Sequence, residues 1–128
     1  MVIDSSALVA ILLREPGWAA VLDRLDAAPQ ALLSAANAFE TAIVMETQKG
    51  AIGGRDFDLF LHEAGIGIVS VTREHFELAR DAWRRFGKGR HPAALNICDC
   101  LAYALAKSTG EPLLFVGDDF TRTDVAVA

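Results

Sequence analysis

The sequence predicts an α/β fold with a mostly parallel central sheet and helices on both of its faces. Short apolar runs alternate along the chain with longer amphipathic stretches, which is the order of parallel strands joined by crossover helices. The chain has 128 residues, of which 52% are hydrophobic, enough for one core and too few for two. We therefore expect a single domain over residues 1–128, without linkers, internal repeats or low-complexity tracts.

Four short apolar runs are predicted to form the strands of the sheet, and a fifth run is a candidate. The runs are bounded by turn formers or by residues that can begin a helix. Gly65 precedes the third run, for example, and Gly117 follows the fourth. The predicted strands are residues 2–4, 31–33, 66–71 and 113–116, with 125–127 as the candidate fifth.

Six stretches combine helical spacing of apolar residues with recognisable ends. Ser5 and Ser6 are candidate caps for the first helix, and Ser34 and Thr72 for two later ones. Gly50 is expected to end the long third helix. The predicted helices cover residues 7–14, 18–27, 35–49, 53–63, 72–86 and 95–106.

The last of these helices is apolar almost all the way round, yet it contains one carboxylate, Asp99. A helix of this kind belongs in a core. Burying an isolated ionised carboxylate is strongly unfavourable, and no Lys or Arg lies one helical turn away to pair with it. Asp99 must therefore be protonated, meet a distant cation or a metal ion, or face a polar cleft.

Further acids are found where the predicted strands end. Asp4 ends the first strand, Asp118 and Asp119 follow the fourth, and Glu40 lies in the helix after the second. In open parallel sheets the binding crevice lies outside the carboxyl ends of the strands, so these acids can meet Asp99 there. Carboxylates that lie this near to one another raise one another's pKa unless cations neutralise their charge. Because Mg²⁺ and Mn²⁺ prefer oxygen ligands and can drive hydrolysis of phosphodiesters, the pattern indicates that chemistry.

Every acid except Asp99 also has an ordinary structural explanation. Asp4 can cap the following helix, and Glu40 can be an exposed helical glutamate. Asp118 and Asp119 can simply form a turn. Spacing alone leaves these explanations open.

Other polar residues are candidates for supporting roles. Ser6 and Asn96 can orient water or a carboxylate beside the site, although each can equally be a helix cap. Half of the Lys and Arg residues fall in the helix and loop before the last helix, and Lys88 and Arg90 lie in the Gly-rich part of that loop. These two suit binding to an RNA backbone, whereas Arg80 is interpreted as part of a solvated helix face.

Charge and cysteine content restrict the function classes further. The formal net charge of −5 argues against coating nucleic acid or anionic membrane by bulk attraction, but leaves room for a local basic patch. Cys98 and Cys100 are two apart on a predicted helix, which disfavours a disulfide between them. No apolar run has the length of a membrane span, and no basic leader region begins the chain. We expect a soluble, cytoplasmic protein without a membrane partner.

Four motifs along the whole chain carry the acids. They read Val-Ile-Asp4-Ser-Ser-Ala-Leu, Ala-Phe-Glu40-Thr-Ala, Gly87-Lys-Gly-Arg-His-Pro-Ala-Ala-Leu-Asn-Ile-Cys-Asp99-Cys and Leu-Leu-Phe-Val-Gly-Asp-Asp-Phe-Thr-Arg-Thr-Asp124. Their order and spacing resemble the PIN-domain ribonucleases, specifically the VapC toxins of bacterial toxin–antitoxin pairs. The resemblance runs essentially from end to end.

This resemblance implies a PIN-like three-layer α/β/α fold with four to five short strands. It also implies a Mg²⁺-dependent endoribonuclease, with Mn²⁺ as an alternative ion, that acts as a homodimer. A VapB-type antitoxin, whose tail occupies the site, would hold it silent. The metal ligands and catalytic residues that carry over directly are Asp4, Glu40 and Asp99.

The fourth acid and one neighbouring residue depart from the family pattern. Since members vary at the residue before the Asp-Phe pair, Asp119 fits the pattern better than Asp118, and Asp124 is an alternative from further along the chain. Cys98 stands where a small Gly is common. We expect Asp119 to be the fourth ligand and neither departure to inactivate the protein.

Two other functions remain as alternatives to a toxin that hydrolyses RNA with metal-activated water. One is a non-catalytic protein-binding module of the same fold. The other is a metal-dependent phosphatase of the haloacid-dehalogenase type, which uses a nucleophilic Asp after the first strand and a second acid two residues later. Ser6 occupies that second position here, which disfavours the phosphatase.

Overall fold

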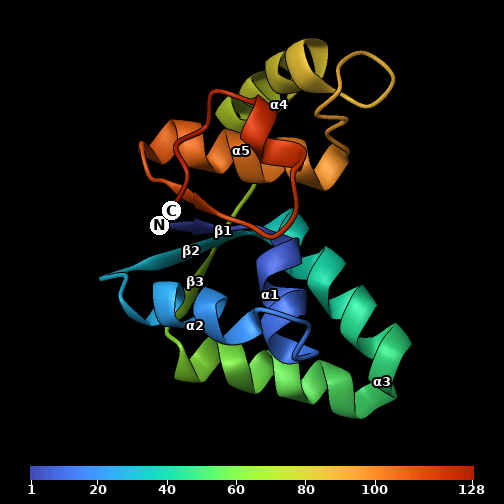
Figure 1. The fold of residues 1–128 in the computed structure, drawn as a ribbon, viewed down its shortest axis with the longest axis vertical. Coiled ribbons are helices and arrows are strands. Elements are labelled where there is room, and N and C mark those ends of the chain that lie inside the picture. The colour runs from blue at the N-terminus through green and yellow to red at the C-terminus, as the bar shows by residue number, and fades with distance from the viewer.

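A computed structural model of residues 1–128 has a four-stranded sheet at its centre, with strand order β3-β2-β1-β4 (Figure 1). All three strand pairs are parallel, and Val2 is in register with both Leu32 and Leu113. The strands are β1 (Val2–Ile3), β2 (Ala31–Ser34), β3 (Ile66–Val69) and β4 (Leu113–Leu114). The predicted α/β fold with a parallel sheet is confirmed.

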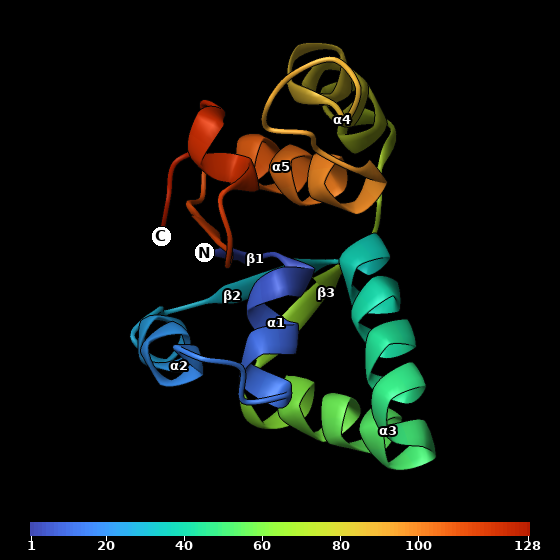
Figure 2. The same ribbon diagram turned by 45° about the vertical axis from the view of Figure 1, so that its right-hand side comes forward.

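Helices cover both faces of this sheet and form the outer layers (Figures 1 and 2). On one side lie α1 (Ser5–Leu12), α2 (Trp18–Asp26) and α3 (Ala35–Glu63). On the other side lie α4 (Arg73–Phe86), α5 (Ile97–Thr109) and a short 3-10 helix, η1 (Asp119–Arg122). Gly50 interrupts α3 with a positive φ of 63°, so its two segments correspond to the two helices predicted on either side of that glycine.

Of the three residues that the sequence offered as caps for α1, Asp4 takes the role and Ser5 and Ser6 do not, because the Asp4 carboxylate accepts a hydrogen bond from the Ser6 backbone N–H at 2.9 Å. The candidate fifth strand is reduced to a single isolated bridge between Leu113 and Val127. By contrast, Thr72 caps α4 as predicted.

The sheet separates two apolar cores of twelve buried residues each. Successive side chains of a strand point to opposite faces, so Val2 packs toward α5 while Ile3 packs toward α1. Tyr103 and Leu105 bury α5 in the first core, which explains why this helix is apolar almost all the way round. No helix has both the length and the apolar character that a bilayer crossing requires.

The parallel sheet also determines where polar groups gather. All four strands end at the same edge, and α1 and α3 start directly after β1 and β2. Asp4 follows β1, while Asp119 begins η1 just after β4. The same edge therefore receives residues from distant parts of the sequence.

Candidate active site

A cavity of about 390 Å³ lies at this edge of the sheet and is lined by twelve residues. The four acids expected from the sequence, Asp4, Glu40, Asp99 and Asp119, all contribute to its lining. Ser6 and Asn96 line it as well, and so does one acid that the sequence did not single out, Glu15. No Lys or Arg is among the lining residues, so the carboxylates in this cavity have no basic counter-charge.

Asp4 is almost fully buried, at 3% exposure, and hydrogen bonds engage both of its carboxylate oxygens. Oδ2 accepts from the Ser6 backbone N–H and from Ser6 Oγ at 2.6 Å, and Oδ1 accepts from Asn37 Nδ2 at 3.1 Å. Burial raises the pKa of Asp4, as does the nearby Glu40 carboxylate, and the Ser6 hydrogen bonds only partly oppose this. Asp4 is thus a helix cap and a cavity residue at once.

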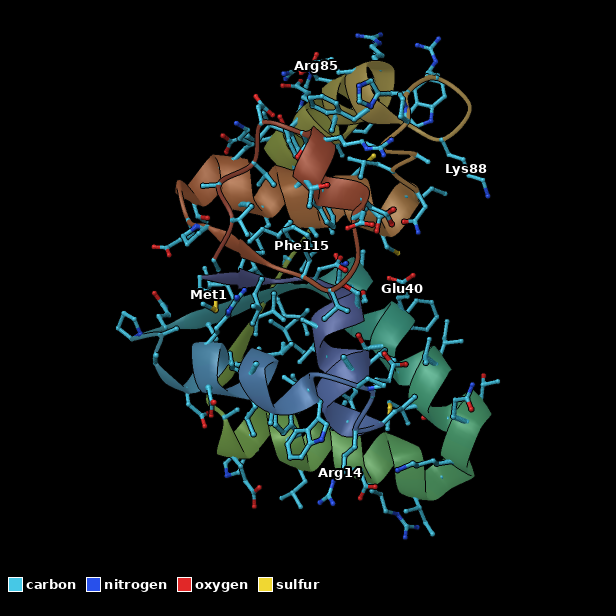
Figure 3. The ribbon with its side chains drawn as sticks, in the orientation of Figure 1. Met1, Arg14, Glu40, Arg85, Lys88 and Phe115 are labelled. Atoms are coloured by element: carbon cyan, nitrogen blue, oxygen red, sulfur yellow. The ribbon has the colours of Figure 1, made fainter.

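Glu40 comes from α3 and is half-buried rather than an exposed helical glutamate. Figure 3 shows it between α3, which carries it, and α5. Its Oε2 accepts a hydrogen bond of 2.6 Å from Ser5 Oγ. Glu40 is therefore held to the start of α1, beside Asp4.

Asp99 lies in the first turn of α5, where it forms a capping box with Asn96. Asn96 Oδ1 accepts from the Asp99 N–H, and Asp99 Oδ2 accepts from the Asn96 N–H, both at 2.8 Å. Burial raises the pKa of Asp99 to about 6, and the Asp4, Asp119 and Glu40 carboxylates add to the increase. The four acids are thus close enough to sense one another's charge, and Asn96 orients Asp99 by capping the helix.

Of the three candidates for the fourth acid, Asp119 lines the cavity, whereas Asp118 and Asp124 do not. Asp124 instead accepts hydrogen bonds from Tyr103 Oη at 2.7 Å and from Arg85 at 3.1 Å. It also pairs with Lys107 at 3.2 Å. These three side chains hold Asp124 against α4 and α5, away from the cavity, so the geometry favours Asp119 as the fourth acid.

The Asp124 cluster leads to a prediction about acid stability. Burial alone would raise the pKa of Asp124, but hydrogen bonds from Tyr103, Arg85 and Lys107 lower it to about 2. The ionised carboxylate therefore stabilises the fold above about pH 4, which is the pKa of an unperturbed Asp side chain. This contribution is lost as the pH falls toward 2. We expect Asp124→Asn to lower the free energy of unfolding by about 1 kcal/mol or less at pH 7, since the site is half-exposed. Urea unfolding at pH 7 and near pH 2.5 checks this, and an equal difference at both pH values would contradict it.

The chemistry of the cavity suits a hard divalent cation. Its ionisable groups are carboxylates, which is the donor type that Mg²⁺ and Mn²⁺ prefer. As the side chains stand, no three His, Cys, Asp or Glu residues are close enough together to hold a metal ion. The acids are gathered around one cavity by their hydrogen bonds, but they do not form a ready-made coordination sphere. The role of the four acids as metal ligands stays a prediction.

Cys98, which stands where the family commonly has Gly, is half-buried beside these acids. Burial raises the pKa of its thiol to about 12, and the Glu40 carboxylate contributes. The thiol therefore stays protonated and adds no further negative charge to the site. Cys98 and Cys100 are both free, as predicted.

The two predicted RNA-contacting residues lie on a folded loop between α4 and α5. Backbone hydrogen bonds of 3.0 Å, from Lys88 N–H to the Leu95 carbonyl and from Leu95 N–H to the Phe86 carbonyl, hold this loop in place. Lys88 extends into solvent on the same side of the molecule as Glu40 (Figure 3). The guanidinium of Arg90 lies 4.4 Å from the centre of the Trp83 ring. Neither cation forms an ion pair with an acid.

The sequence also did not reveal Asn37, which is fully buried on α3 behind the residues that line the cavity. Its amide donates to both Asp4 and Ser5. Two signals could have pointed to it: an amide among apolar neighbours, and its position three residues before Glu40, on the same side of the helix. Neither signal names its partners, which come from a distant segment.

Known proteins match this chain over its full length. The PIN domain family profile matches residues 1–126. The protein named Ribonuclease VapC from Mycolicibacterium smegmatis is 51% identical over 126 residues, which are 98% of each chain. Among solved structures, Mycobacterium tuberculosis VapC20, described as a Sarcin-Ricin loop cleaving toxin, superposes with a TM-score of 0.79 at 15% identity, covering 99% of this chain and 97% of that one. A toxin–antitoxin complex from Klebsiella pneumoniae gives 0.76 at 16% identity, with 99% and 95% covered. The two structures share the fold, and the match of sequence over the whole chain identifies the family: the chain belongs to the PIN-domain proteins, among the VapC ribonucleases.

Proposed function

We propose that this chain is a metal-dependent endoribonuclease, acting as the toxin of a toxin–antitoxin pair. The observation that carries the proposal is the single cavity lined by Asp4, Glu40, Asp99 and Asp119, which come from four separate parts of the sequence. A cavity with several carboxylates and no basic residue is electrostatically unfavourable unless cations enter it. The relatives named ribonucleases match this chain from end to end.

The residues that would hold Mg²⁺, or alternatively Mn²⁺, are the same four acids. Such an ion neutralises charge on a phosphodiester and lowers the pKa of water at the site. Asp4 and Asp99 are oriented for this role by Ser6 and by Asn96, respectively. Each of these two acids is fixed at the start of a helix, so the carboxylates present a fixed negative surface to the cation.

Substrate binding is assigned to the loop that precedes α5. Lys88 and Arg90 are exposed there and unpaired with acids, so they can hold RNA phosphates next to the acidic cavity. Contacts of this kind position the backbone and carry little sequence information. The reaction is a direct hydrolysis by water and requires no covalent intermediate on the protein.

The two alternatives make different use of the same residues. A phosphatase of the haloacid-dehalogenase type needs a second acid two residues after Asp4, but Ser6 is there and its hydroxyl donates to the Asp4 carboxylate. A non-catalytic binding module would have no need for uncompensated carboxylates in a cavity, because they only weaken the fold. The nuclease accounts for both observations.

We propose a VapB-type antitoxin and a second copy of this chain as protein partners. One apolar groove on α4 and α5 leaves Phe76 54% and Ile97 80% exposed, which is unusual for an isolated chain. A second groove, between α1, α2 and α3, contains Trp18 and Phe60. The structural neighbour from Klebsiella pneumoniae is a toxin–antitoxin complex. Light scattering that gave the mass of one chain would contradict the homodimer.

Because Cys98 and Cys100 are free, we place the activity in the reducing cytoplasm.

Cleavage of a mixed RNA pool by the purified protein tests the function. We expect endonucleolytic cuts with Mg²⁺ or Mn²⁺, complete loss of cutting when EDTA is added, and recovery when excess Mg²⁺ is restored. A simple phosphomonoester should not be turned over. Cutting that persists in EDTA would contradict metal dependence, and a folded, antitoxin-free protein that leaves all RNA intact would favour the binding module.

A further inference from the structure

The side-chain amide of Asn37 lies at the centre of a hydrogen-bond network that links two of the candidate ligands. Its Nδ2 donates to Asp4 Oδ1 at 3.1 Å and to Ser5 Oγ at 3.0 Å. Ser5 Oγ in turn donates to Glu40 Oε2 at 2.6 Å. One amide therefore connects the carboxylate at the end of β1 with the carboxylate on α3.

The direction of this network is determined by the groups that surround the amide. Asp4 Oδ1 can only accept when the carboxylate is ionised, so the amide must turn its NH₂ group, and not its oxygen, toward it. The single Ser5 hydroxyl proton goes to Glu40, the shorter of the two contacts it makes, because the Asn37 backbone carbonyl is 3.3 Å away. Ser5 Oγ is then free to accept from the amide.

This orientation leaves the other end of the amide without a partner. Asn37 Oδ1 is buried and makes no hydrogen bond, although the residue is 0% exposed. Buried polar groups without partners are rare in folded proteins and call for an explanation. An apolar side chain here would avoid the unsatisfied oxygen, so the amide is better explained by what its NH₂ group does for the acids.

We propose that Asn37 is a positioning residue for the metal site, holding Asp4 directly and Glu40 through Ser5. The inference rests on the proposed metal-dependent nuclease function and names a residue outside the four acids. Two carboxylates that repel each other would otherwise turn apart. The donors on Asn37 and Ser5 compensate part of that repulsion and keep both acids at the same end of the cavity.

A comparison of Asn37→Ala with Thr41→Val tests this proposal. Thr41 is a matched control because it is also fully buried on α3, one turn later, and its hydroxyl donates only to the Asn37 backbone carbonyl. Mn²⁺ serves as the probe, and its affinity for the full-length protein is measured by titration calorimetry. The thermal midpoint without metal and the Mn²⁺ concentration for half-maximal RNA cleavage are measured on the same samples.

We expect Asn37→Ala to weaken Mn²⁺ binding by roughly 10–100-fold, as is usual when a residue that orients a metal ligand is removed. The Mn²⁺ concentration for half-maximal cleavage should rise in parallel, with a smaller change in the rate at saturating Mn²⁺. Thr41→Val should lower the thermal midpoint but leave Mn²⁺ affinity within about two-fold, because it touches no acid. A purely structural role for Asn37 would instead lower the midpoint and leave the affinity unchanged.

Ser5→Ala is the second variant, because it removes only one hydroxyl group and breaks the link to Glu40 while the Asn37–Asp4 contact remains. It should weaken Mn²⁺ binding less than Asn37→Ala does, and it keeps the test decisive if Asn37→Ala does not fold. Wild-type affinity in Ser5→Ala and in any folded Asn37→Ala sample would overturn the positioning role. A wild-type protein that neither binds Mn²⁺ nor cleaves RNA would overturn the proposed function itself, which separates the two failures.

Discussion

Asp99→Asn should abolish RNA cleavage while leaving the fold intact. The substitution removes the negative charge that would hold a cation, and we expect the cleavage rate to fall by at least about 100-fold. Asn keeps the size of the side chain and an oxygen that can accept from the Asn96 N–H, so the capping box at the start of α5 should survive. Initial cleavage rates at saturating Mg²⁺ measure the loss.

The same variant should be more stable than the wild type when no metal is present. Burial raises the pKa of Asp99 to about 6, which means that keeping this carboxylate ionised at pH 7 costs more free energy in the folded protein than in the unfolded chain. A neutral Asn relieves that cost, by about 1–3 kcal/mol. Excess Mg²⁺ should reverse the order of the two thermal midpoints, because only the wild type gains from binding the ion.

Asp124→Asn is the matched control for this experiment. It removes a carboxylate of the same type that lies outside the cavity, against Tyr103 and Arg85. Cleavage should therefore stay near the wild-type rate, and Mg²⁺ should still raise the thermal midpoint. If Asp99→Asn and Asp124→Asn lost activity equally, the assignment of the cavity as the active site would be wrong.

The difference between these two acids shows what the sequence could predict. Apolar periodicity located the strands, and the rule that crevices lie at the carboxyl ends of parallel strands then selected Asp4, Glu40, Asp99 and the pair Asp118 and Asp119. The family resemblance favoured Asp119 within that pair, and Asp119 lines one cavity with the other three acids. The position of Asp124 could not be read in this way, because it depends on tertiary contacts made by the chain after η1.

Residue type and sequence position also did not show which of several candidate residues caps α1. Ser5 and Ser6 are good helix caps by type, yet Asp4 takes that role because its backbone is extended and its carboxylate reaches the Ser6 N–H. The serines are then free to donate to Glu40 and Asp4. Asn37 escaped notice for a related reason, since its two acceptors lie more than 30 residues away in sequence.

Two adjacent glycines in α3 should respond oppositely to the same substitution. The two segments of α3 run in different directions from the turn at Gly50 (Figure 2), and Gly53 is buried just after that turn, beside Met45 of the first segment. A Cβ at Gly53 would lie 2.2 Å from the Met45 carbonyl oxygen, which is backbone and cannot move aside. A Cβ at Gly54 would meet only the carboxyl end of the Glu46 side chain, at 2.7 Å.

We expect Gly53→Ala to lower the free energy of unfolding by about 1–3 kcal/mol, since it forces atoms into a filled space. Gly54→Ala should raise it by up to about 1 kcal/mol, because Glu46 can rotate away and Ala is the better helix former. Urea unfolding of both variants measures the two values. Helix propensity is the same at both positions, so a difference in sign reflects the different space around the two Cβ positions. If both variants were stabilised, the Met45 carbonyl would have to lie further from Gly53 than it does here.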